Sequence, residues 1–228
     1  MKIFMLLLVL SVKAYSETQV FEALAKKDGQ IAYVEKHTVV YDEQTVIKSL
    51  TEYLDPDGKV IATMNSDFTR NVGAPEFILR DQRHESFQGL KWKQGKPEIF
   101  SREAKKKLVA HKVLSLDQKE VPISGPGLIY FVAANLEKII SQEILEFQYI
   151  IPGRLEAFDF YIKTLAHNHK VAEFEVSIKS WLLRLFGPRL KLIYDIQKKR
   201  VVSFEGISNL RDGEGKMMSV DIQYKYHN

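Results

Sequence analysis

The chain has 228 residues, of which 45% are apolar and 11% aromatic, and it carries a formal net charge of +4 with no cysteine. This length and apolar share suffice for one large buried core, and no interior linker or repeat divides the chain. The near balance of charge gives no support to nucleic-acid binding, which usually requires a clustered basic face. Without cysteine the chain has neither disulfides nor a lipid-modified cysteine, so we expect a single domain held by core packing alone.

Residues 1–16 have the pattern of a secretory signal peptide. A lysine supplies the positive start, residues 3–12 are apolar, and Ala14 and Ser16 form a small-x-small cleavage site. An apolar run of about ten residues is too short to cross a bilayer, which takes roughly twenty. We therefore expect cleavage after Ser16, a mature domain over residues 17–228 without a transmembrane segment, and a location in the bacterial periplasm. Secretion to the medium is the alternative.

Residues 30–70 indicate the fold class. The sequence Asp55-Pro56-Asp57-Gly58 predicts a reverse turn, because proline presets φ and glycine accepts a left-handed conformation. Beyond the turn, apolar side chains recur at even spacing, at Val60, Ala62, Met64 and Phe68. A period of two is typical of a strand with one buried face. This part of the chain therefore predicts an antiparallel β protein.

The same alternation recurs along most of the remaining chain. Strands are predicted within residues 77–100, 144–151, 157–165, 171–179, 190–196, 200–207 and 219–226. The charged stretch within residues 98–113 fits either a solvated strand or a helical turn. Residues 17–29 predict a short helix, because Val20, Phe21 and Leu24 have helical spacing. In total we expect about nine to eleven strands.

One internal helix is predicted over residues 128–141. Gly125-Pro126-Gly127 precedes it, and proline suits the first turn of a helix. Its apolar stripe consists of Leu128, Phe131, Val132, Leu136 and Ile139. The first two turns are apolar nearly all round, as expected of a helix covered on two sides. The later apolar run at residues 181–186 is expected to be core, with an exposed hydrophobic lip as the alternative.

These elements predict a mainly β (α+β) fold. An open meander of this width would expose its apolar side, so it must curl or close. We expect a strongly curved antiparallel sheet, or a partly open β-barrel, that wraps the helix at residues 128–141.

At this level the chain resembles exported bacterial proteins of the LolA and LppX type. The resemblance rests on the signal peptide, the strands within 30–70 and 157–179, the helix after Gly125-Pro126-Gly127, and the closing stretch 194–210. That last stretch also resembles segments of uncharacterised periplasmic proteins. The resemblance implies a curved sheet that wraps a helix around an apolar cavity, and carriage of acyl chains or lipoproteins. Since the chain lacks cysteine, it would be a soluble member.

The leading functional hypothesis is a non-enzymatic protein that binds an acyl chain or another hydrophobic ligand in the concavity of its sheet. The residues expected to line that cavity are Val60, Met64, Phe68, Phe131, Phe158, Phe160 and Phe174. Which face of each strand points inward stays open. The alternative is a cell-envelope structural or protein-interaction module, with an interior filled by its own side chains and an envelope protein as partner. An enzyme ranks third.

Residues that could carry chemistry are scattered. His167 and His169 supply half of a zinc site, which needs three or four ligands, so a polar turn is expected there. The remaining candidate histidines occur singly, at His37, His84 and His111. No Gly-x-Ser-x-Gly elbow or cysteine nucleophile is present. Carboxylates available for a glycosidase-like pair are Glu35, Asp67 and Asp81, whose separation the sequence does not set. We predict no catalytic residue, no metal and no cofactor.

Overall fold

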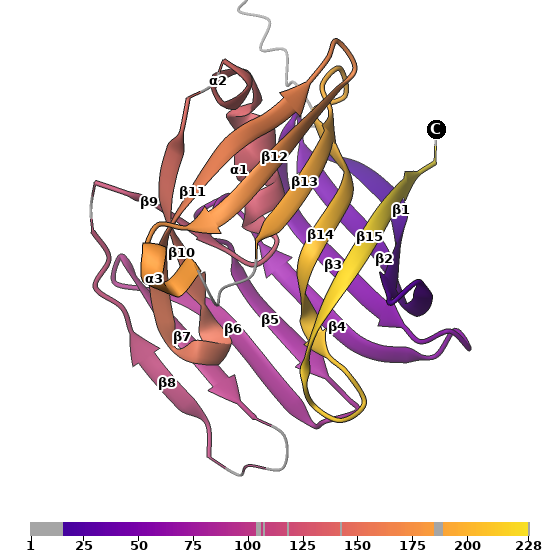
Figure 1. Cartoon of the computed structure of the whole chain (residues 1–228). Coiled ribbons are helices and arrows are strands. Elements are labelled where there is room, and N and C mark those ends of the chain that lie inside the picture. Colours follow the sequence, from indigo (N-terminus) through magenta and orange to yellow (C-terminus); the bar gives the residue numbers. More distant parts are fainter. Residues whose placement is uncertain are drawn as a thin grey trace, which may run out of the picture.

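The computed structural model describes residues 16–103, 106, 108–117, 119–141, 143–184 and 189–227 (Figure 1). The predicted signal peptide, apart from Ser16, lies outside the described residues. The strands are β1 (Ser16–Lys27), β2 (Gln30–Asp42), β3 (Thr45–Leu54), β4 (Val60–Asp67), β5 (Glu76–Asp81), β6 (Ser86–Lys93), β7 (Lys96–Arg102), β8 (Ala110–Val113), β9 (Val121–Ser124), β10 (Leu145–Ile151), β11 (Glu156–His167), β12 (Val171–Ile178), β13 (Leu190–Asp195), β14 (Arg200–Arg211) and β15 (Met217–Tyr226). The helices are α1 (Gly127–Ala134), α2 (Leu136–Ile140), the 3-10 helix η1 (Pro152–Arg154) and α3 (Trp181–Arg184).

All these strands belong to one open sheet. Its order is β8-β7-β6-β5-β4-β3-β2-β1-β15-β14-β13-β12-β11-β10-β9. Neighbouring strands are antiparallel, apart from β9 and β10, which are parallel. β1 pairs with β15, so the two ends of the described chain meet in the middle of the sheet, and β8 and β9 form its edges. The predicted antiparallel sheet is confirmed, and it is not closed by pairing of its edge strands.

The sheet curls so that its N-terminal half faces its C-terminal half, with α1 between them (Figure 1). Along β1 the inward side chains Phe21, Ala23 and Ala25 are at most 3% exposed. Near the two edges of the sheet, η1 contacts β6 and β7, and Leu114 is buried in the same region. Side-chain packing therefore brings the two halves together where strand pairing does not.

Helix α1 fills the space between the halves of the sheet. The ring of Tyr130 lies 5.0 Å from that of Phe68, just beyond β4. On the other side, the Tyr194 hydroxyl of β13 donates a hydrogen bond of 2.8 Å to the Ile129 carbonyl. Leu128 is buried as well. The prediction of a helix covered on two sides is confirmed for this segment.

The helix predicted over residues 128–141 is two shorter helices. The chain breaks at Asn135, whose side-chain amide donates to the Phe131 carbonyl at 2.9 Å. That bond occupies a carbonyl of the last turn of α1 and ends the helix there. The apolar stripe nevertheless continues into α2, where Leu136 and Ile139 are buried.

The prediction of nine to eleven strands was too low, because the described residues already form a sheet of fifteen. Residues 17–29, predicted as a helix, belong to strand β1, which pairs with β2 and β15. Phe21, Ala23 and Ala25 alternate there, and pairing on both sides outweighs the helical spacing of three residues. The ambiguous stretch 98–113 contributes β7 and the short β8.

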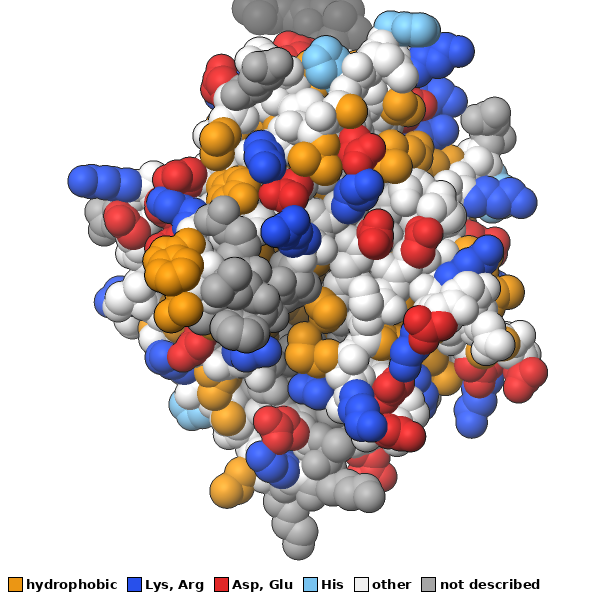
Figure 2. All heavy atoms as spheres, in the orientation of Figure 1, with side chains coloured by type: hydrophobic (Ala, Val, Ile, Leu, Met, Phe, Trp, Pro, Cys, Tyr) orange, Lys and Arg blue, Asp and Glu red, His pale blue; other side chains and the backbone are white. Residues whose placement is uncertain are grey.

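The expectation that residues 181–186 are core is wrong for the first two of them. Trp181 is 72% exposed and Leu182 is 54% exposed. Hydrophobic side chains accordingly lie on the surface over α3 (Figure 2). Residues 185–186 lie outside the described part of the chain. Among the described residues, none of the helices combines the length and apolar character needed to cross a bilayer.

Candidate functional site

The inner face of β5, β6 and β7 changes from apolar to polar toward one end. Three rows of paired residues cross these strands: the apolar row of Phe77, Leu90 and Ile99, the mixed row of Leu79, Gln88 and Ser101, and the polar row of Asp81 and Ser86. Residues at every second position share one face of a strand, so all three rows point inward. The apolar core therefore ends on this side in a polar opening, which we call the mouth and which begins at Gln88, Ser101, Asp81 and Ser86.

A bulge in β14 forms the opposite wall. The pairing of β14 with β15 shifts register between Ile207 and Arg211, and such bulges re-aim the side chains they contain. The Ser208 hydroxyl lies 2.7 Å from the hydroxyl of the buried Tyr33. Polar groups of the bulge thus meet phenol hydroxyls that rise from β2 and β3.

Asn209, next in the bulge, hydrogen-bonds the hydroxyl of Tyr53. Burial of Tyr53, reinforced by the nearby charge of Glu35, raises the pKa of this phenol well above its ordinary value. The hydroxyl therefore stays protonated at all ordinary pH values. Asn209 is itself exposed, so it connects the core to the mouth.

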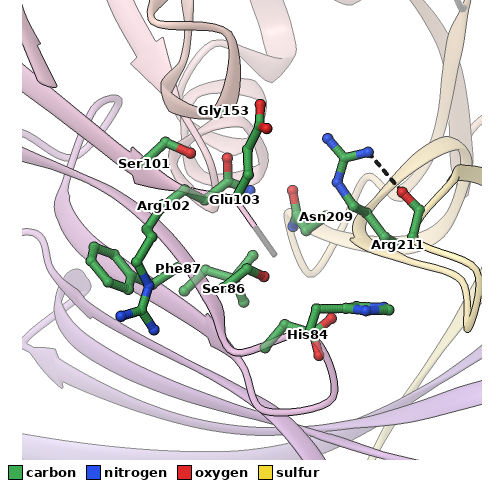
Figure 3. A pocket seen from close by; sticks show the side chains of 13 residues that line it. His84, Ser86, Phe87, Ser101, Arg102, Glu103, Gly153, Asn209 and Arg211 are labelled. Carbon is green, nitrogen blue, oxygen red and sulfur yellow. Dashed lines mark hydrogen bonds between the residues drawn. The ribbon is translucent and has the colours of Figure 1, made fainter. Parts of the chain in front are cut away.

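Between the two walls lies a cavity of about 280 Å³ (Figure 3). It is bounded by the inner ends of β5, β6 and β7, by Gly153 of η1, and by the β14–β15 hairpin. A smaller cavity of about 60 Å³ is bordered by Met64, Phe77 and Tyr149. The residues common to both are Leu79, Gln88 and Asn209. Through this shared wall, the larger cavity at the polar mouth lies directly next to the smaller, apolar cavity.

Hydrogen bonds between the β5–β6 turn and the β14–β15 hairpin set the distance between the two walls of the cavity. Asp81 holds Arg83 through two contacts, 2.7 Å to Nη2 and 3.1 Å to Nε. The same Nη2 donates to the Arg211 carbonyl at 2.8 Å. The His84 Nε2 lies 2.8 Å from the Asp212 carbonyl and must carry the proton, since a carbonyl only accepts. The β5–β6 turn is therefore tied directly to the β14–β15 hairpin.

Neutral hydrogen-bonding side chains lie between these walls, together with charged lining residues that include Glu103 and Arg211. In Figure 3, Ser86 and Asn209 point toward the cavity, whereas Arg102 and Phe87 extend away from it. Gly153 allows close approach, because a Cβ there would lie only 2.5 Å from Gln88 Oε1. Hydroxyl and amide groups in this arrangement can both donate to and accept from a polar ligand group.

A hydrogen-bonded chain of hydroxyl, imidazole and carboxylate lies deeper in the core. Thr51 Oγ1 is 3.0 Å from His37 Nδ1, and His37 Nε2 is 2.8 Å from Glu35 Oε2. The order matches a hydrolase triad. However, Thr51 is 2% exposed and Glu35 is 5% exposed, and none of the three residues lines either cavity. We interpret this chain as a network that satisfies a buried carboxylate.

Of the residues predicted to line an apolar cavity, Met64 borders the smaller of these two. Val60 is half-buried at the start of β4. Phe158 is also half-buried and packs against the core cluster of the C-terminal half. The two cavities described here are lined by none of the other six predicted residues.

The other predicted lining residues pack against aromatic neighbours. Phe131 and Phe160 lie 5.4 and 6.1 Å from the ring of Phe147. Phe174 meets the ring of Tyr194 at 5.9 Å in an edge-on contact. Phe68 is 1% exposed and packs on α1, as described above. Around the helix, the concavity is therefore occupied by the protein's own rings.

The other chemically interesting residues lie apart from the mouth. Hydrogen bonds from Thr69 lower the pKa of Asp67, which caps a turn. The polar turn predicted at residues 166–170 begins only after His167, which still belongs to β11, and it contains His169 as predicted. His111 of β8 is 3.6 Å from Glu98. The described residues contain no cluster of three or more metal-type side chains.

Comparisons with known proteins give few matches. No family model matches the chain, and no curated protein matches it either. A solved structure of a β-barrel-like protein of the domain of unknown function DUF1849 from Brucella abortus aligns with a TM-score of 0.42 and 7% identity. The alignment covers 96% of this chain and 100% of that one. Membership of the LolA or LppX type stays a prediction.

The mouth itself was missed by sequence reasoning. Ser86, Gln88 and Ser101 continue the alternation of their strands but replace apolar residues at inward positions. That break in the pattern was the available signal, because polar residues at inward positions mark the place where a core meets water. Asn209 gave no such signal, since the β14 bulge that re-aims it depends on pairing with β15.

Proposed function

We propose that the protein is a non-enzymatic binding protein of the cell envelope that holds an amphiphilic ligand at the mouth of its curved sheet. The observation that carries this proposal is the shared wall of the two cavities, which joins hydroxyl and amide groups to Met64, Phe77 and Tyr149. The larger cavity, at about 280 Å³, is close to the lower end of the usual range for ligand sites. The polar head of the ligand would occupy the mouth. A short part of its acyl chain would occupy the smaller, apolar cavity.

The location follows from the signal-peptide pattern of residues 1–16. The predicted export signal and the curved sheet around α1 are the features in which the chain resembles the LolA and LppX type, and the absence of cysteine would make it a soluble member. We extend the resemblance only to ligand class, an acyl chain or another lipid. No residue role is transferred from those proteins.

A second function is favoured by the aromatic packing around α1. The rings of Phe131, Phe147 and Phe160 fill the concavity where a long chain would have to lie. A protein with a filled interior would work through its surface, as a structural or protein-interaction module of the envelope. The two functions differ in whether blocking the mouth abolishes binding.

Binding of cis-parinaric acid, a fluorescent long-chain fatty acid, tests the first function. The parent should bind it saturably at micromolar levels, since each buried methylene contributes about 0.8 kcal/mol before ordering costs. Ser101→Trp places an indole in the mouth and should weaken binding by about tenfold, equivalent to the loss of roughly two methylenes. Native mass spectrometry of protein from its own host should show a co-purified lipid.

Ser219→Trp is the matched control, because Ser219 is exposed on β15 and lies outside both cavities. It should bind the probe as the parent does. Equal affinity of the parent and Ser101→Trp would place the ligand elsewhere. A folded parent that neither binds the probe nor carries lipid would leave the interaction module as the better function.

A further inference from the structure

The outer face of β5, β6 and β7 carries a second feature, which borders the larger cavity through Phe87 and Arg102. Strand register places Phe87 between Arg80 and Arg102, and Gly89 beside Phe100. These residues alternate with the buried Leu90 and Ile99, so they point to the convex side of the sheet. The guanidinium carbons of Arg80 and Arg102 lie 5.7 and 4.8 Å from the centre of the Phe87 ring.

Gly89 makes room for the second ring of this face. A Cβ at Gly89 would lie 2.6 Å from Cζ of Phe100, so the ring lies flat over the glycine. The Lys91 ammonium is 5.8 Å from the centre of the same ring. The ring centres of Phe87 and Phe100 are 6.2 Å apart. These cationic side chains and the two rings form one continuous surface, which we call the basic face. Its centre consists of Arg80, Phe87, Lys91, Phe100 and Arg102.

The charge of the basic face is one-sided. Its basic side chains are Arg80, Lys91, Lys93, Lys96 and Arg102. Its carboxylates are Glu76, which accepts from the Trp92 amide, and Glu98, which lies near His111. Among the described residues, Lys91, Lys93 and Lys96 have no carboxylate within ion-pair distance. Lys93 and Lys96 face each other across β6 and β7, so their charge remains available to an external anion, whereas Lys91 faces Glu98 across the same strands.

Exposed aliphatic side chains border the basic face at the edge of the sheet. Leu108 is 86% exposed, Val109 is 46% exposed and Val113 is 48% exposed. Strand β8 lies beside β7, and His111 pairs with Phe100. Val113 pairs with Glu98, so it shares the convex side with the cations. Leu108 and Val109 precede the Ala110–Ser101 pair, so they lie at the Arg102 end of β7, whereas Lys93 and Lys96 lie at its other end. Exposed apolar groups and cations spread along one edge of a sheet are the composition of an interfacial membrane-binding surface.

We propose that the basic face docks the protein on the surface of an anionic lipid bilayer. Lys91, Lys93 and Lys96 would meet lipid headgroups, and Leu108 and Val109 would enter the boundary of the acyl region. The rings are already covered by Arg80, Arg102 and Lys91, so they support cations rather than stack on a ligand. An acidic protein would pair with the cations but would leave the exposed leucine unexplained.

Sedimentation with vesicles of phosphatidylcholine containing phosphatidylglycerol tests this proposal. The parent should bind these vesicles, bind pure phosphatidylcholine weakly, and lose binding as salt rises. The double substitution Lys91→Glu with Lys93→Glu should lower the partition coefficient at least roughly 25-fold, since each basic residue contributes about fivefold near an anionic surface. Leu108→Ser should lower it by roughly tenfold.

The matched control is Lys36→Glu with Lys225→Glu, which makes the same charge change on exposed positions of β2 and β15. It should keep most of the binding, and melting curves should show all variants folded. If the control variant lost as much vesicle binding as the test variant, net charge alone would explain the loss, and the proposal would be overturned. Binding to a soluble polyanion but not to vesicles would also overturn it, in favour of an acidic macromolecular partner. Neither result bears on fatty-acid binding at the mouth.

Discussion

Substitution of Leu136 measures how much the inward packing of α2 stabilises the fold. Leu136 is 2% exposed and belongs to a core cluster with Ile139 and Phe147. Removing its volume in Leu136→Ala should cost about 2–5 kcal/mol. For a chain of this size, each kcal/mol lowers the melting temperature by about 2–4 °C, which gives a decrease of roughly 4–20 °C. Leu136→Asp should cost more, because a carboxylate without a partner would be buried.

Thermal unfolding followed by circular dichroism provides the measurement. Glu137→Ala is the control, since the neighbouring Glu137 side chain is 86% exposed and only pairs with Lys199 at 3.2 Å. Surface pairs of this kind contribute at most about 1 kcal/mol. If Leu136→Asp melted within a degree or two of the parent, the packing of α2 against the sheet described here would be wrong.

Three further predictions concern the backbone, pH and processing. Gly89→Ala should lower stability by at least about 2 kcal/mol, because its Cβ would lie 2.2 Å from the Phe77 carbonyl oxygen, whereas Gly213→Ala, with open space, should melt like the parent. Burial raises the pKa of Tyr149 to about 12, so the parent should lose stability as pH rises from about 10 to 12, where the unfolded phenol ionises first; in urea titrations Tyr149→Phe should lose roughly 2–3 kcal/mol less over that range. Protein recovered from the periplasm should begin within about two positions of Glu17 by N-terminal sequencing, and full-length protein in the membrane fraction would contradict the signal peptide.

Sequence reasoning predicted the strands best where one buried face is purely apolar. Residues 171–179 were predicted from strict alternation, and β12 spans Val171–Ile178 with Phe174 and Val176 fully buried. The turn at residues 55–58 was predicted from its chemistry, and Asp55 accepts two backbone hydrogen bonds there. Both signals are local, so no knowledge of distant contacts was needed.

The helix predicted over residues 17–29 shows where local signals fail. Val20, Phe21 and Leu24 fit a helical face, while Phe21, Ala23 and Ala25 fit a strand face, and alanine suits either. Pairing of β1 with both β2 and β15 decides between them, and the partner strands lie at opposite ends of the chain. A central strand with small inward residues therefore gave a misleading pattern.

The sequence by itself determined the β class, most strand positions, the tight turns and the apolar character of the helical segment. Only the tertiary structure decided that α1 and aromatic rings occupy the concavity, that Ser101 and Asn209 border one cavity, and that Lys91 lies over Phe100. Alternation and turn chemistry depend on neighbours a few residues away, so they can be recognised locally. The curl of the sheet depends on side-chain volumes and hydrogen bonds between strands far apart in sequence, and these act only when the whole sheet is assembled.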